Sequence, residues 1–132
     1  MSLRPRSRRV LLALLAATIG LGLASRRFAG HLPALVASYA GDVLWAVMVY
    51  WLLALVVVRA RPVCLGAGAL GVAVLVEVSQ LIHTPGLDML RQNPFGALVL
   101  GQGFLWSDLA CYAVGAMGAV LLDRALHITG TD

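Results

Sequence analysis

Apolar runs close to the length of a bilayer crossing dominate this chain and restrict its fold most. A transmembrane helix needs about 20 largely apolar residues. With 61% hydrophobic residues among 132, the chain is too apolar for a soluble domain of this size. We therefore predict an all-α fold, a single integral membrane domain over residues 1–132. It is a polytopic membrane bundle of four transmembrane helices, at residues 10–24, 34–58, 63–82 and 105–122.

The first run has a second interpretation. Four arginines precede residues 10–24, and a charged start followed by a short apolar run is typical of a signal peptide, with residues 22–24 as a passable cleavage site. Cleavage would leave three spans. We interpret the run as a retained helix, because its flanking arginines can snorkel and extend its reach.

The connections are predicted from turn residues and charges. Residues 25–33 form the first loop, and residues 84–86 end the third helix. A polar connection containing Asp88 and Arg91 follows. Residues 95–104 are apolar but, at about ten residues, too short to cross, so we predict a re-entrant or interfacial segment there.

Arginine placement predicts the orientation. All ten basic residues are arginines, and the net charge is +4. They lie at the ends of the apolar runs and form no basic stripe on a soluble face, so we predict no nucleic-acid partner. The positive-inside rule favours both termini in the cytoplasm of a bacterial inner (cytoplasmic) membrane. That topology puts Arg4, Arg6, Arg8, Arg9, Arg59, Arg61 and Arg124 inside and Arg26, Arg27 and Arg91 outside.

Polar side chains inside or beside the apolar runs mark the candidate site. A charged group at mid-bilayer costs about 2.5 to 3.5 kcal/mol, so Glu77 and Asp108 need partners or water. Two helix faces are predicted, one with Glu77, Gln80 and Thr84 and one with Asp108, Tyr112 and Gly115. Both gather towards the outer leaflet. The candidate binding residues are Asp42, Glu77, Gln80, His83, Asp88, Arg91, Ser107, Asp108 and Tyr112.

Each candidate also has a purely structural interpretation. Glu77 with Gln80 could belong to an interhelical hydrogen-bond set, and Asp88 with Arg91, three residues apart, could be a local ion pair. His83 is typical of an interfacial residue. No His, Cys or carboxylate triad has metal-ligand spacing, so we predict no metal and no cofactor.

The polar residues resemble those of a known family. The run 77–80, the loop with Asp88 and Arg91, and Ser107-Asp108 with a later glycine resemble VanZ-like membrane proteins. A related family of small four-helix bacterial proteins, known only as a domain of unknown function, is more similar still. The resemblance covers nearly the whole chain, including residues 25–28, 41–42, 44–45 and 103–108. It implies fold more than function. Tyr112 stands where VanZ proteins usually have Asn, so antibiotic resistance is not carried over.

Two functions of different classes follow. The first is a binding or transport module, in which Arg91 and the carboxylates hold the head group of an amphiphilic or lipid-linked ligand, with membrane lipids as partners. The second is an enzyme acting on a lipid-linked substrate at the outer leaflet, with Glu77 and Asp108 as acid and base. The sequence contains no nucleophile motif that supports the enzyme. We favour binding.

Overall fold

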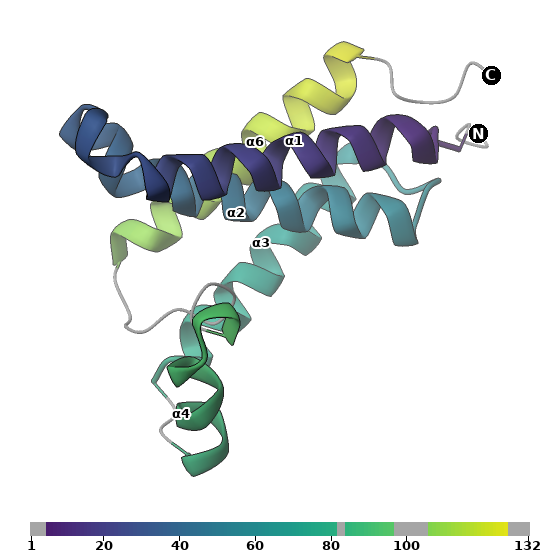
Figure 1. Ribbon diagram of the computed structural model, residues 1–132. Coiled ribbons are helices and arrows are strands. Elements are labelled where there is room, and N and C mark those ends of the chain that lie inside the picture. The colour runs from purple at the N-terminus through teal and green to yellow at the C-terminus, as the bar shows by residue number, and fades with distance from the viewer. Residues whose placement is uncertain (1–4, 82–83, 97–105, 127–132) are drawn as a thin grey trace.

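The computed structural model describes residues 5–81, 84–96 and 106–126, and the regular elements in these ranges are helices (Figure 1). A 3-10 turn, η1 (Ala29–His31), and a short helix, α4 (Pro85–Gln92), join longer helices. The all-α prediction is confirmed, and the helices suit a multi-pass membrane protein. Those long and apolar enough to cross a membrane are α1 (Arg8–Arg27), α2 (Ala34–Val56), α3 (Pro62–Ser79) and α6 (Trp106–Leu126).

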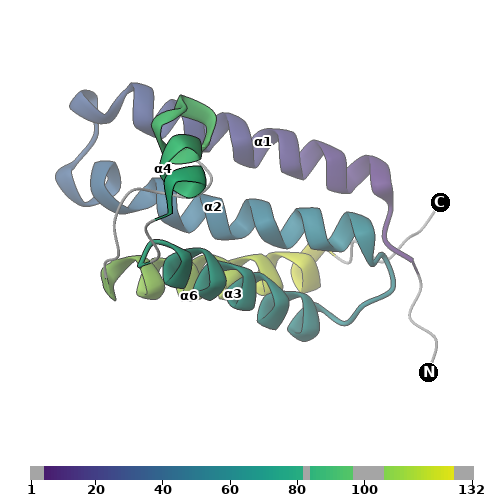
Figure 2. The same ribbon diagram turned by 90° about the horizontal axis from the view of Figure 1, so that it is seen from below.

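Helix α2 is the centre of the bundle. The helices α1, α3 and α6 all pack against it, and α3 also packs against α6. Seen from below, α1 lies on the opposite side of α2 from α3 and α6 (Figure 2). The fold is therefore a three-helix core with α1 added outside it. Helix α1 is the least buried of the four, which leaves most of its surface for lipid.

Small residues bring α3 and α6 together. Gly66 lies so close to α6 that a Cβ there would be 2.6 Å from Val120 Cγ2. Ala69 and Ala73 continue the same buried face. In lipid the hydrophobic effect does not drive helices together, so they associate through close packing of their backbones. Gly71, by contrast, has open space around it.

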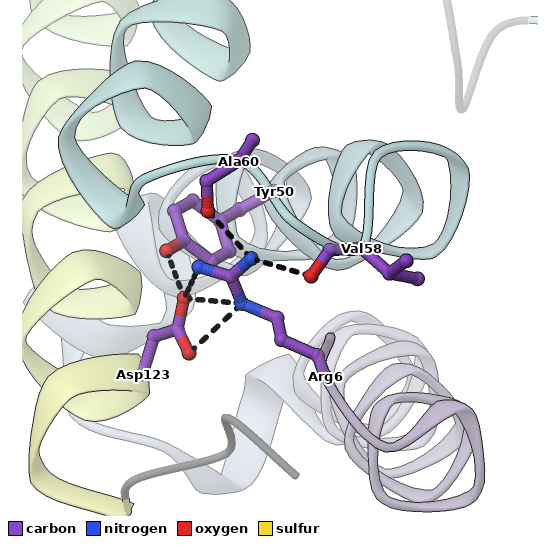
Figure 3. A network of polar contacts seen from close by, with 5 residues as sticks. All are labelled: Arg6, Tyr50, Val58, Ala60 and Asp123. Atoms are coloured by element: carbon purple, nitrogen blue, oxygen red, sulfur yellow. Dashed lines mark hydrogen bonds and ion pairs between the residues drawn. The ribbon is translucent and has the colours of Figure 1, made fainter. Parts of the chain in front are cut away.

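A polar cluster joins both ends of the chain at one end of the bundle (Figure 3). The Arg6 guanidinium forms an ion pair with Asp123 of α6, with Nη2 2.9 Å from Oδ2. Its Nη1 donates to the backbone carbonyls of Val58 and Ala60, which follow α2. Tyr50 of α2 donates to Asp123 Oδ2 at 2.5 Å. Because Arg6, Tyr50 and Asp123 are all buried, this cluster connects the N-terminal segment, α2 and α6.

The first loop begins later than expected. We predicted a loop over residues 25–33, whereas α1 continues to Arg27. Ser25 Oγ donates to the Gly22 carbonyl and arginine is a good helix former, so nothing ends the helix at residue 24. Two arginines in the last turn also suit the negative end of the helix dipole.

The polar connection after α3 is partly helical, which corrects two predictions. Helix α3 ends at Ser79, so Thr84 does not share its face with Glu77. Thr84 instead caps α4, its hydroxyl accepting from the Leu87 amide at 3.3 Å. Pro85 at the first helical position and Asp88 in the first turn favour a helix start there. Most of the predicted re-entrant segment at 95–104 lies outside the described residues and stays a prediction.

Candidate functional site

The site begins where α6 meets α2 near the end opposite the Arg6 cluster. Gly115 of α6 lies against α2 so closely that an added Cβ would collide with the Val43 carbonyl oxygen. This contact holds the two helices together near Asp42 and Asp108. Asp42 precedes Val43 on α2 and Asp108 lies two turns before Gly115 on α6, so this contact puts the two carboxyl groups on adjoining helices, close enough for Asp108 to act electrostatically on Asp42. Two neighbouring carboxylates repel each other, so the pair attracts a cation.

Glu77 brings a third carboxyl group from α3. Its side chain is completely buried. Tyr112 of α6 donates its hydroxyl to Glu77 Oε1 at 2.8 Å, and Gln80 Nε2 lies 3.5 Å from the same oxygen. Glu77 also acts electrostatically on Asp42. Helices α2, α3 and α6 therefore each supply one carboxyl group, and we call Asp42, Glu77 and Asp108 the carboxyl cluster.

Arg26 supplies positive charge from α1. Its guanidinium lies on the backbone of Gly41, where an added Cβ would be 3.3 Å from Arg26 Nε. Glycine at position 41 thus makes room for the guanidinium directly beside Asp42. Arg26 acts electrostatically on Asp42, and the exposed position of its side chain leaves it accessible to a ligand.

Trp45 packs beside the carboxyl cluster. Its ring centroid lies 5.2 Å from that of Tyr112, with the two planes tilted by 48°. Tilted aromatic pairs at this spacing attract each other. Trp45 therefore supports the tyrosine that holds Glu77.

Arg91 contacts the end of α3. Its side chain is buried, and Nη2 donates to the Ser79 carbonyl at 2.5 Å, at the C-terminal end of α3. Its Nη1 lies 3.4 Å from Asp88 Oδ1, so the predicted local ion pair is present. These contacts join α4 to the last turn of α3, which carries Glu77. Arg91 thereby positions the end of that helix.

The structure brings most of the predicted residues together. Tyr112 contacts Glu77, Gln80 lies beside Glu77, and Asp42 and Asp108 lie on the adjoining parts of α2 and α6. Ser107 is exposed on α6. His83 lies outside the described residues, so its place in the site remains a prediction.

Sequence reasoning missed Arg26, Trp45 and the pair of Arg6 with Asp123. Arg26 was placed in the first loop and Trp45 was named only within the resemblance, although Gly41-Asp42 on the next helix could have suggested a partner for the arginine. The Arg6 to Asp123 pair was missed completely, since the two residues are separated by 117 positions. Its one sequence signal is an aspartate on the same face as the small residues of α6, where Ala116 and Ala119 are also buried.

The comparisons support a family but not an activity. The family model described as "Protein of unknown function (DUF2809)" matches residues 31–116. The chain belongs to this family. The DUF2809 match includes α2, α3, α4 and the first half of α6, and thus all three residues of the carboxyl cluster. The predicted membership of a family of unknown function is confirmed. No solved structure matches the chain.

Proposed function

We propose that this protein binds the head group of a membrane amphiphile at the carboxyl cluster, on the outer-leaflet side of the bacterial cytoplasmic membrane. One observation carries the proposal: α2 and α6, which bear Asp42 and Asp108, touch at Val43 and Gly115, and Tyr112 of α6 holds Glu77 of α3, all on helices long and apolar enough to cross a membrane. Ionisable groups in such helices are costly and mark binding or transport sites. An acidic cluster favours a cationic ligand, and an ammonium group can supply both charge and hydrogen-bond donors. The head group is therefore an amine.

Lipid retention tests the proposal. The protein is purified in mild detergent from membranes containing phosphatidylethanolamine, which carries an amine, and phosphatidylglycerol, which does not. Mass spectrometry then measures the ratio of the two lipids that remain bound. We expect phosphatidylethanolamine to be enriched over its share in the starting membrane. Equal retention of both lipids would contradict an amine site.

Asp108→Asn should abolish most of this enrichment. The change keeps size and hydrogen bonding but removes a charge, and a hydrogen bond to a charged group contributes about 1.5 to 3 kcal/mol. That range corresponds to a loss of about tenfold or more in relative affinity. Asp108→Glu, which keeps the carboxylate, is the matched control and should keep most of the enrichment. Chemical turnover of the head group by the unmodified protein would instead favour the enzyme alternative.

Cysteine labelling tests the orientation that the outer-leaflet assignment needs. Cys64 and Cys111 are first replaced by alanine. Arg27 and Arg61 are both exposed and lie at opposite ends of the bundle, so single cysteines there differ mainly in membrane side. We expect Arg27→Cys to react with an impermeant maleimide on intact cells and Arg61→Cys to react only after permeabilisation. The reverse pattern would place the site on the cytoplasmic side.

A further inference from the structure

An apolar groove runs between α1 and α2 beside the carboxyl cluster. Its volume is about 210 Å³, and its wall is mostly apolar, with Ile19 and Leu23 from α1, Leu44 and Met48 from α2, and Phe95 from the segment after α4. Gly22 also lines the groove, and because it has no side chain it leaves this part of the groove unfilled. Pockets for compact drug-sized ligands begin at about 300 Å³. A slim chain therefore suits this groove better than a bulky ring system.

One end of the groove is polar. Arg26 and Gly41 line it together, and this is where the guanidinium lies beside Asp42. Arginine presents several donors in a fixed fork, which matches the oxygens of a phosphate. A ligand lying in the groove with a phosphate on Arg26 would have its next group beside the acidic Asp42. Charge complementarity thus suggests a ligand with three consecutive parts: an apolar chain in the groove, a phosphate at Arg26 and an amine at the carboxyl cluster.

Trp45 connects the groove to the carboxyl cluster. It lines the groove and also packs on Tyr112, which donates to Glu77. The groove and the carboxyl cluster therefore both border the pair of Trp45 and Tyr112. A single ligand can contact both.

We infer that the groove between α1 and α2 holds one acyl chain of a phospholipid whose phosphate binds Arg26 and whose amine reaches the carboxyl cluster. The inference rests on the proposed function and narrows its ligand to an amine-bearing glycerophospholipid. The chain enters from the lipid, because α1 makes its main helix contact with α2 and is the least buried of the helices long enough to cross a membrane.

Two glycines of α1 provide a matched test of the chain position. The probe is phosphatidylethanolamine with a photoreactive diazirine on one acyl chain, in phosphatidylglycerol vesicles containing the protein. We expect cross-links on groove peptides of α1 and α2. Gly22→Phe fills the groove and should lower them about tenfold. Gly20→Phe is the control, since Gly20 has open space around it and its side chain would point into lipid. Ile19→Trp fills the same groove and replaces Gly22→Phe if that variant does not fold.

Arg26→Gln tests the phosphate. It should weaken retention of phosphatidylethanolamine about tenfold. Retention of a long-chain alkylamine, which has no phosphate, should not fall, because the carboxyl cluster loses a competing cation. Arg27→Gln, at an exposed neighbour, should change neither.

The outcomes separate the two proposals. Amine-dependent retention that is lost in Asp108→Asn but unaffected by Gly22→Phe, Ile19→Trp and Arg26→Gln would overturn the groove assignment and leave the proposed function standing. No preference for the amine lipid would overturn the proposed function itself. Cross-links from the groove to a second protein chain, in place of lipid, would show that the groove is a helix-docking surface and would also overturn the acyl-chain assignment.

Discussion

Asp123→Leu should lower the free energy of unfolding by about 3 to 5 kcal/mol, the usual cost of removing one partner from a buried ion pair. Arg6 would keep its two backbone carbonyl partners but would lose the carboxylate that balances its charge. Tyr50 would lose the acceptor of its hydroxyl. Unfolding is followed by circular dichroism during titration of mixed micelles with sodium dodecyl sulfate.

Two further variants show whether the buried charge causes this loss. Arg124→Leu changes an exposed arginine next to Asp123 and should shift stability by less than about 0.5 kcal/mol. The double variant Arg6→Met with Asp123→Leu should be more stable than Asp123→Leu alone, because no unpaired charge remains. If Asp123→Leu and Arg124→Leu have equal effects, Arg6 reaches water and the cluster does not hold the chain ends together.

Two substitutions at Glu77 should have different effects on stability and on lipid binding. Glu77→Gln keeps an oxygen that can accept from Tyr112, so we expect nearly unchanged stability and a loss of phosphatidylethanolamine enrichment of about tenfold or more. Glu77→Leu removes the acceptor as well and leaves the buried Tyr112 hydroxyl without it. Its stability cost should lie between about 0.6 kcal/mol, an average interhelical hydrogen bond in membranes, and about 3 kcal/mol, a buried polar group left unsatisfied.

Tyr112→Phe is the partner variant for this series. Combined with Glu77→Leu it removes the stranded hydroxyl, so the two costs should not add. Binding and unfolding are measured on the same purified samples. Full lipid enrichment in Glu77→Gln would mean that Glu77 serves only to join α3 to α6. A neutral Glu77→Leu would exclude that structural role too.

The sequence predicted the helices well because a bilayer imposes a length on them. Apolar runs of about 20 residues bounded by arginine or proline leave few choices, and α2, α3 and α6 differ from their predicted limits by a few residues. Helix α1 is longer than the predicted helix at residues 10–24, because arginines that mark a membrane boundary do not end a helix. Helix α4 was missed because eight polar and apolar residues in a connection carry too little periodic signal, although Thr84 and Pro85 are a good helix start.

The site was partly predictable for a similar reason. Helical periodicity alone puts Asp108, Tyr112 and Gly115 on one face, and the cost of a charge in lipid turns that face inward. The structure agrees, since Tyr112 and Gly115 are buried against α2 and Tyr112 binds Glu77. That Arg26 would lie on Gly41 depends on the crossing of α1 and α2, about which local sequence says nothing.

By itself, the sequence predicted the described helices that are long and apolar enough to cross a membrane, and the face of α6 that carries Asp108 and Tyr112, because these follow from hydrophobic length and from a period of 3.6 residues. Only the tertiary structure decided which polar faces meet and which charges pair. Arg6 pairs with Asp123 across 117 positions, and Arg26 lies on Gly41, next to Asp42, across the interface of α1 and α2. Such pairs depend on how helices cross, and crossing is set by small residues packed against a neighbour that the local sequence does not identify.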